Sequence, residues 1–161
     1  MSNMIYHEVQ RFRRWWLLIG VVATTAGCLF IIIDYGREEN SAYIGIFALI
    51  ISLLLLLTMK MDTKITDTGV YVRMFPLLMR TRHFEWSDID KAYTRTYQPL
   101  EEYGGWGIKG TGNNRAYNVS GKQGLQLELK DGRRILIGTQ KPQEIDEVLN
   151  IIHKNASFRI R

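Results

Sequence analysis

Residues 124–138 read GLQLELKDGRRILIG, and this stretch decides the fold. Apolar side chains recur at every second position on both sides of its centre, at Leu125, Leu127, Leu129, Ile135 and Ile137. A period of two is typical of a strand with one buried face. Asp131-Gly132 is a dipeptide favoured in two-residue hairpin turns, because both central positions of such a turn require positive φ. The stretch therefore predicts a β-hairpin whose apolar face contributes to a core.

Shorter stretches upstream show the same alternation. A predicted strand over residues 70–74 places apolar side chains on one face, Val70, Val72 and Met74. Tyr71 and Arg73 fall on its other face. Residues 75–79 are predicted to be a connection, because Pro76 would interrupt a central strand. We expect further strands over 64–66, 81–86 and 91–97, which are rich in strand-forming residues.

A C-terminal helix is predicted over residues 142–154. Pro142 in its first turn loses no hydrogen bond, because the first helical N–H groups have no partner in the helix. Its apolar residues follow the spacing i, i+3, i+4, i+7 and form one stripe, Ile145, Val148, Leu149 and Ile152. We therefore expect an α+β domain over residues 60–161, an antiparallel seven-stranded roll or barrel capped by this helix.

Two uncharged apolar stretches precede this domain, at residues 15–33 and 43–59. As helices they would be roughly 28 Å and 26 Å long, close to the hydrocarbon thickness of a bilayer. A helix that is apolar on every side lies in a large core or in lipid. A chain of 161 residues is too short to enclose two such helices in a core. We therefore expect a transmembrane hairpin of two helices, joined by a short external loop over residues 34–42.

Charges beside the two stretches predict their orientation. The loop carries three acidic residues and one Arg, whereas the opposite ends are basic, at Arg11, Arg13, Arg14, Lys60 and Lys64. The positive-inside rule then places residues 1–14 and 60–161 in the cytoplasm. Aromatic residues at the ends of the spans are predicted to anchor the helices at the membrane interface, Trp15, Trp16, Tyr35 and Tyr43. We expect an integral plasma-membrane protein with both termini in the cytoplasm.

A processed signal sequence is an alternative for the first stretch. Basic residues followed by an apolar run resemble a signal peptide, and residues 25–28 (TAGC) resemble a lipoprotein cleavage box. Two features oppose this interpretation. Thr25 stands where such boxes usually carry an aliphatic residue, and the apolar run continues past Cys28, beyond the length of a signal core. Cys28 is the only cysteine, so no internal disulfide can form.

Several segments of the β-rich part carry a family resemblance. These are residues 65–70 (ITDTGV), 84–89 (FEWSDI), 137–145 (IGTQKPQEI), 103–108 (YGGWGI) and 116–121 (AYNVSG). Their order resembles that of the bacterial pleckstrin-homology-like (PH-like) domains, which often follow transmembrane hairpins. The resemblance covers roughly residues 60–154 and implies a PH-like fold. Such domains are generally binding modules, so the resemblance implies binding without naming a ligand.

No cluster of residues predicts a reaction. Residues 105–110 (GWGIKG) match the spacing of a dinucleotide-binding glycine loop, but residues 111–114 form another loop where that motif requires a helix. The glycine-rich loop 104–112 is left without an assigned role. The histidines His7, His83 and His153 are dispersed and lack the spacing of metal ligands. Adjacent acidic residues in loops do not flank a substrate bond. We expect no catalytic, cofactor-binding or metal-binding residue.

The net charge of +5 lies wholly within residues 60–161, which hold 17 Lys and Arg against 12 Asp and Glu. A scattered excess of this kind suits a surface near anionic groups rather than a nucleic-acid groove, and we expect no nucleic-acid partner. Five basic residues are candidates for contacting anionic lipid headgroups or a partner protein, Lys60, Lys64, Arg73, Arg80 and Arg82. The alternative is that these charges serve only topology and solubility.

The predicted function is a membrane-anchored, non-catalytic interaction or scaffold module. Its partners would be the bilayer, anionic headgroups, a protein or a second copy of the chain. The alternative is a structural or accessory subunit of a larger membrane complex, because small residues line the first apolar stretch, at Gly20, Ala23, Ala26 and Gly27. The absence of charge within the two stretches argues against transport. An enzyme is a further alternative.

Overall fold

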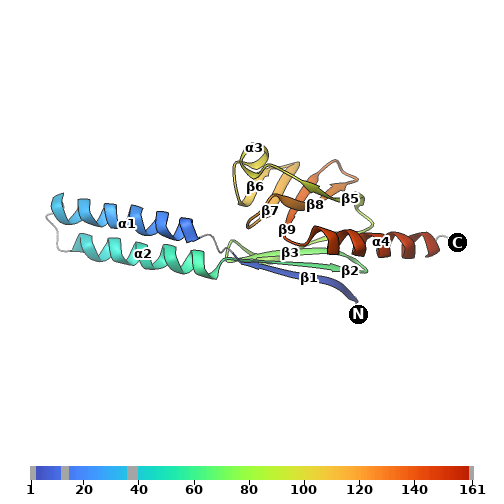
Figure 1. Cartoon of the computed structure of the whole chain (residues 1–161), viewed down its shortest axis with the longest axis horizontal. Coiled ribbons are helices and arrows are strands. Elements are labelled where there is room, and N and C mark those ends of the chain that lie inside the picture. The colour runs from blue at the N-terminus through green and yellow to red at the C-terminus, as the bar shows by residue number, and fades with distance from the viewer. Residues whose placement is uncertain (1–2, 12–14, 36–39, 160–161) are drawn as a thin grey trace. The chain divides into compact units, whose positions relative to one another are not determined.

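The computed structural model describes residues 3–11, 15–35 and 40–159. Within its helices, the side chains of residues 15–18, 24, 31–35, 40–42, 44–45, 55–56 and 155–159 are not described. The chain divides into two compact units (Figure 1). One consists of Met1–Arg11 with Lys60–Arg161, and the other is Phe12–Met59.

The second unit contains two helices, α1 (Trp15–Tyr35) and α2 (Asn40–Thr58), which contact each other. Within the described residues, no helix has both the length and the apolar character that crossing a membrane requires. The predicted transmembrane hairpin is therefore wrong. The predicted plasma-membrane location, which rested on that hairpin, is corrected with it.

The physical reason is that a span needs one helix with continuous apolar character over roughly 20 residues. Counting apolar letters in the sequence does not establish this. Of the four predicted interface anchors, Tyr43 is exposed, and the side chains of Trp15, Trp16 and Tyr35 lie outside the described residues. Residues 36–39, four of the nine residues of the predicted external loop, also lie outside them.

The first unit begins with a four-stranded antiparallel sheet. Its strands are β1 (Met4–Arg11), β2 (Lys60–Thr66), β3 (Gly69–Phe75) and β4 (Leu78–Glu85), in the order β1-β2-β3-β4. The sequence did not predict β1. It precedes α1, yet it pairs with β2, which follows α2. The helical unit is therefore inserted between two neighbouring strands of one sheet.

A second, five-stranded sheet follows. Its strands are β5 (Ile89–Thr96), β6 (Gly107–Thr111), β7 (Asn114–Asn118), β8 (Gln123–Leu129) and β9 (Arg134–Thr139), in the order β5-β8-β9-β7-β6. A short helix, α3 (Pro99–Tyr103), joins β5 to β6. The pairing of β7 with β9 is parallel. The predicted antiparallel seven-stranded roll is thus corrected to two sheets, which contain nine strands over the described residues.

The β8–β9 hairpin has the predicted apolar alternation and a different turn. Leu125, Leu127 and Ile137 are almost fully buried, as their period of two predicted. Only Gly132 in the turn has positive φ (85°), because the turn has three residues rather than two. The N–H of Gly132 donates to the Leu129 carbonyl (2.9 Å), which is typical of a type I turn followed by a left-handed residue.

The C-terminal helix α4 (Pro142–Arg159) begins where the sequence predicted and contacts β5, β8 and β1. Its stripe is buried at Ile145, Val148 and Leu149. In Figure 1 it lies alongside strands of the first sheet. The two sheets meet at the start of this helix, where the Gln10 amide on β1 donates to the Gly138 carbonyl on β9 (2.7 Å).

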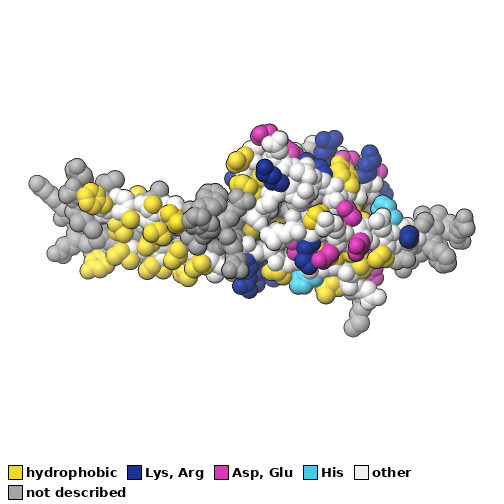
Figure 2. All heavy atoms as spheres, in the orientation of Figure 1, with side chains coloured by type: hydrophobic (Ala, Val, Ile, Leu, Met, Phe, Trp, Pro, Cys, Tyr) yellow, Lys and Arg dark blue, Asp and Glu magenta, His cyan; other side chains and the backbone are white. Residues whose placement is uncertain are grey.

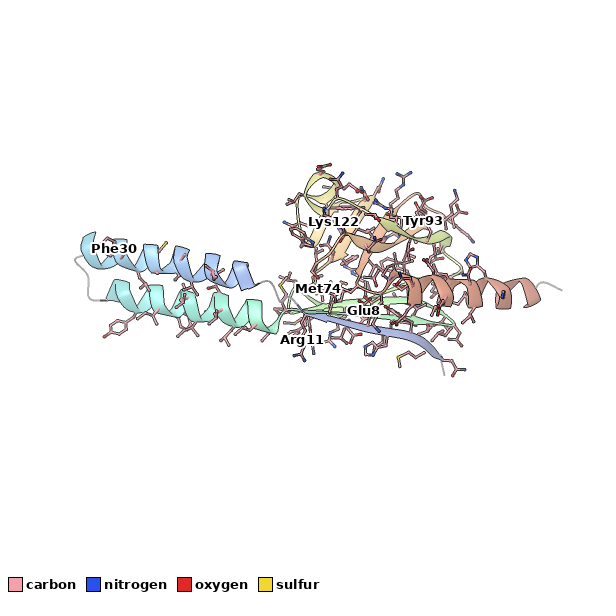
Figure 3. All side chains as sticks on the ribbon, viewed as in Figure 1. Glu8, Arg11, Phe30, Met74, Tyr93 and Lys122 are labelled. Carbon is pink, nitrogen blue, oxygen red and sulfur yellow. The ribbon has the colours of Figure 1, made fainter. Side chains whose placement is uncertain are left out.

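Glu8, labelled in Figure 3, makes a second polar connection at this meeting point. Its buried carboxylate accepts hydrogen bonds from the Tyr6 hydroxyl (2.8 Å) and the Thr139 hydroxyl (2.7 Å). It also accepts one from the Gln140 N–H (2.9 Å), just before α4. Burial, reinforced by this carboxylate, raises the pKa of Tyr6, so its hydroxyl stays protonated and donates. Glu8 therefore ties the N-terminal strand to the end of β9.

Gly138 lies in the central strand of the second sheet, where a side chain does not fit. A Cβ added there would lie 2.9 Å from the Asn118 Cβ, and Asn118 is fully buried. We expect Gly138→Ala to lower the free energy of unfolding by about 1–3 kcal/mol through overpacking, measured by urea denaturation. Gly132→Ala is the control, because its Cβ meets open space and only its positive φ is penalised. Unchanged stability in Gly138→Ala would contradict the close contact.

Candidate functional site

In the two central strands of the first sheet, β2 and β3, the polar side chains lie mostly on the outward face. Residues at every second position of β2 and β3 point into the core, and their side chains are fully or almost fully buried: Met61, Thr63, Ile65, Val70, Val72 and Met74. The residues between them therefore point outward. We call this outward surface the open face, formed by His7, Asp62, Lys64, Tyr71, Arg73, Thr81 and His83.

Strand register aligns the open face in rows. His7, Lys64, Tyr71 and His83 lie opposite one another across β1, β2, β3 and β4. In the next row, Asp62 lies opposite Arg73. Directly opposite side chains in an antiparallel pair have Cβ atoms about 5 Å apart. Residues distant in sequence therefore form one continuous polar surface.

A surface pocket of about 360 Å³ lies on this face. It is lined by Asp62, Lys64, Tyr71, Arg73 and Thr81. An irregularity in strand pairing lies beside it, because the β3–β4 register shifts between Val72 and Met74. Arg73 on β3 thereby opposes the unpaired stretch 79–81 of β4. Bulges of this kind interrupt the ladder and redirect side chains, which explains why Arg73 and Thr81 line a hollow rather than a flat sheet.

Three contacts hold Asp62 and Tyr71, which both line the pocket. A ring nitrogen of His7 (Nε2) lies 2.9 Å from the Asp62 carboxylate (Oδ1). The Tyr71 ring stacks on His83, with 4.0 Å between ring centroids and 7° between ring planes. The Tyr71 hydroxyl lies 3.1 Å from the Thr68 hydroxyl. Asp62 and Tyr71 are therefore held in place by neighbouring side chains.

Lys64 and Arg73 are the cations of the pocket. Over the described part of the chain, neither makes an ion pair or a side-chain hydrogen bond, and both are exposed. The pocket thus holds two available cations and one carboxylate, which is already engaged by His7. Positioned donors of this kind suit a carboxylate or phosphate group. No group of three His, Cys, Asp or Glu that could hold a metal occurs within residues 3–11, 15–35 and 40–159.

The structure separates the five basic residues that the sequence singled out. Lys64 and Arg73 come together in the pocket. Lys60 starts β2 and lies opposite Phe75, two positions along the strand from Asp62. Arg80 and Arg82 lie on β4, where Arg82 opposes Val72 and so belongs to the inward side of the sheet, although it is exposed.

The other members of the open face were not predicted as site residues from the sequence: His7, Asp62, Tyr71, Thr81 and His83. Asp62 and Lys64 are two positions apart, as are Tyr71 and Arg73. Residues two positions apart in a strand share a face, so this spacing could have placed Asp62 and Tyr71 on the same face as the two cations. His7 was not placed, because β1 was not predicted. Thr81 carries no signal in the sequence, since its place in the pocket depends on the bulge.

The glycine-rich loop forms a second hairpin. Residues 107–111 are strand β6, so GWGIKG does not open a helix and a dinucleotide loop is excluded on geometry. Gly110 has φ of 88°, and a Cβ there would collide with the Asn114 carbonyl. The Trp106 indole donates to the Gly121 carbonyl (3.2 Å). Gly110 is therefore required by the close approach of β6 to β7 beside their turn.

No model of a known protein family matches the chain, and no curated protein matches it. The resemblance to bacterial PH-like domains is accordingly corrected, because its family is not matched and its transmembrane hairpin is not found in the described residues. The chain is a small, mostly β-sheet domain with two sheets and a C-terminal helix, together with the separate helical unit.

Proposed function

We propose that this protein is an interaction module whose open face captures an acidic group of a partner protein. The observation that carries the proposal is the pocket that Lys64 and Arg73 both line, where neither has an ion-pair partner among the described residues. Two cations at one hollow give an anionic side chain two charge-assisted contacts, which are stronger than neutral hydrogen bonds. No catalytic step enters the proposal.

The mixed charge of the face favours a protein over a lipid surface. Asp62 lies between strands that carry cations, and it would be repelled by a uniformly anionic leaflet. A partner protein can place an acidic residue at Lys64 and Arg73 while it avoids Asp62. Specificity of this kind arises from complementary charges and from penalties against wrong partners. Anionic headgroups are the competing source of the same chemistry.

Titration of the full chain with three probes tests the proposal. The probes are an oligoglutamate peptide, inorganic phosphate, and phosphatidylcholine vesicles with and without phosphatidylglycerol. We expect saturable binding of oligoglutamate that weakens steeply with salt, because exposed charges are screened over about 8 Å at physiological ionic strength. Binding only to vesicles that contain phosphatidylglycerol would show that the open face recognises lipid headgroups rather than a protein. No binding of any probe at low salt would refute anion capture.

A second candidate function is favoured by the helical unit. Large apolar side chains of α1 and α2 are exposed, and Figure 2 shows hydrophobic side chains gathered over these helices. They are Ile19, Val22, Phe30, Tyr43, Ile46, Phe47, Ile50, Ile51, Leu54 and Leu57. Extended exposed apolar surfaces mark sites of interaction. We therefore infer that the chain is a subunit of a larger assembly, joined through these helices.

Chemical cross-linking in cells tests this second function. We expect the chain in adducts larger than one copy, and we expect Phe47→Gln with Ile51→Gln to reduce them at least several-fold. Both residues are exposed, so the polar change removes contact surface without emptying a core. Leu100→Gln on α3 is the control, because Leu100 is about as exposed as Phe47 (67% and 65%) and lies outside the helical unit. Adducts that persist in the double variant would contradict the role of the helices.

A further inference from the structure

β4 is an edge strand that no other element covers within the described residues. It pairs only with β3, at one end of the first sheet. Residues 79–83 are exposed on both faces of the strand. The opposite edge strand, β1, differs, because its inward side chains Tyr6, Glu8 and Gln10 are buried. An uncovered edge presents unpaired N–H and C=O groups, which are a template for another strand.

The charges along β4 favour one kind of partner strand. Arg80 and Arg82 lie two positions apart on β4, and both are exposed. A second copy of β4 would place Arg beside Arg, and like charges directly opposite are destabilising. An acidic strand would instead pair each Arg with an opposite charge. Two exposed apolar residues flank the start of the same edge, Leu77 just before β4 and Met79 within it.

From these observations we propose that the partner binds by strand addition, as an extended acidic segment that pairs with the free edge of β4 and places acidic side chains at alternate positions against Arg80 and Arg82. The proposal rests on the proposed function, because it names the form of the acidic partner. Main-chain hydrogen bonds supply affinity in this mode, and alternate side chains supply specificity.

The test uses a peptide of alternating glutamate and valine and two analogues of it. One analogue carries N-methyl groups on the glutamates and the other on the valines, so the charge of all three peptides is equal. In an added strand, only one of these two sets of N–H groups faces β4. We expect one analogue to bind the full chain about tenfold more weakly and the other to bind like the parent, because only one loses hydrogen bonds.

The outcomes separate strand addition from anion capture. If all three peptides bind equally, strand addition is overturned while anion capture stands. If neither these peptides nor oligoglutamate binds, the proposed function itself fails.

A pair of double variants tests whether the peptide binds at β4. We expect Arg80→Thr with Arg82→Thr to weaken the unmodified peptide at least severalfold, since two opposite-charge pairs are lost. Threonine retains strand propensity, so the backbone of β4 is preserved. Lys122→Thr with Lys130→Thr is the matched control, because both lysines are exposed outside the first sheet and the charge change is the same. Equal binding by the two double variants would place the peptide elsewhere.

Discussion

Glu8→Ala is expected to lower the free energy of unfolding of the β-rich unit by about 3 kcal/mol. The carboxylate accepts three hydrogen bonds, from Tyr6, Thr139 and Gln140. A hydrogen bond to a charged group is worth about 1.5–3 kcal/mol, and donors left buried without a partner add their own desolvation penalty. The change also leaves a void beneath the start of α4, since Glu8 is only 6% exposed.

Two further substitutions make this prediction specific. Glu8→Gln keeps the shape and can still accept from the Gln140 N–H, so we expect a smaller loss of about 1 kcal/mol. Glu101→Ala removes an exposed carboxylate on α3 and is expected to change stability by less than about 0.5 kcal/mol. Chemical denaturation followed by tryptophan fluorescence gives all three values. A Glu8→Ala protein as stable as Glu101→Ala would show that the connection is dispensable.

Reversing the two free cations is expected to have the largest effect on binding. Lys64→Glu with Arg73→Glu replaces two attractive contacts in the pocket by two repulsive ones. An exposed ion pair is worth up to about 1 kcal/mol, so losing two and adding comparable repulsion amounts to about 3 kcal/mol. Since 1.4 kcal/mol is tenfold in affinity, oligoglutamate should bind roughly 100-fold more weakly.

The control for this prediction has the same net charge. Lys122→Glu with Lys130→Glu reverses two exposed lysines near the ends of β8, away from the open face. If the probe were held by long-range attraction to the net charge alone, both double variants would weaken its binding equally. We expect less than about a threefold change in the control, because exposed charges beyond a Debye length are screened. A similar loss in both variants would mean that net charge, and not the pocket, attracts the probe.

The sequence predicted the strands that alternate apolar and polar residues in the usual sense. The β8–β9 hairpin, β3 and α4 were found because most of their buried residues are Leu, Ile, Val and Met. β1 was missed because its pattern is inverted. Its inward residues include the polar Glu8 and Gln10, whereas the apolar Ile5 and Val9 point outward and are exposed. Periodicity of hydrophobicity cannot reveal a strand whose buried face is polar.

The candidate site was predictable only in part, for a similar reason. Lys64 and Arg73 were singled out by their charge, but only register brings them to one pocket, through the pairing of β2 with β3. The register of a strand depends on the whole sheet and cannot be predicted from the sequence of either strand alone. Arg80 and Arg82 were grouped with them from closeness in sequence, whereas the bulge and the pleat assign Arg82 to the other side. The membrane prediction was wrong because composition was taken as sufficient for a span.

The measurement that tests the central claim most directly is the mapping of amide chemical shifts during titration of the full chain with oligoglutamate. The claim is that the open face is the binding surface. We expect the largest saturable shifts at Asp62, Lys64, Tyr71, Arg73 and Thr81, and along β4. We expect these shifts to disappear in Lys64→Glu with Arg73→Glu. Saturable shifts confined to the second sheet or to α4, with the open face unchanged, would contradict the account.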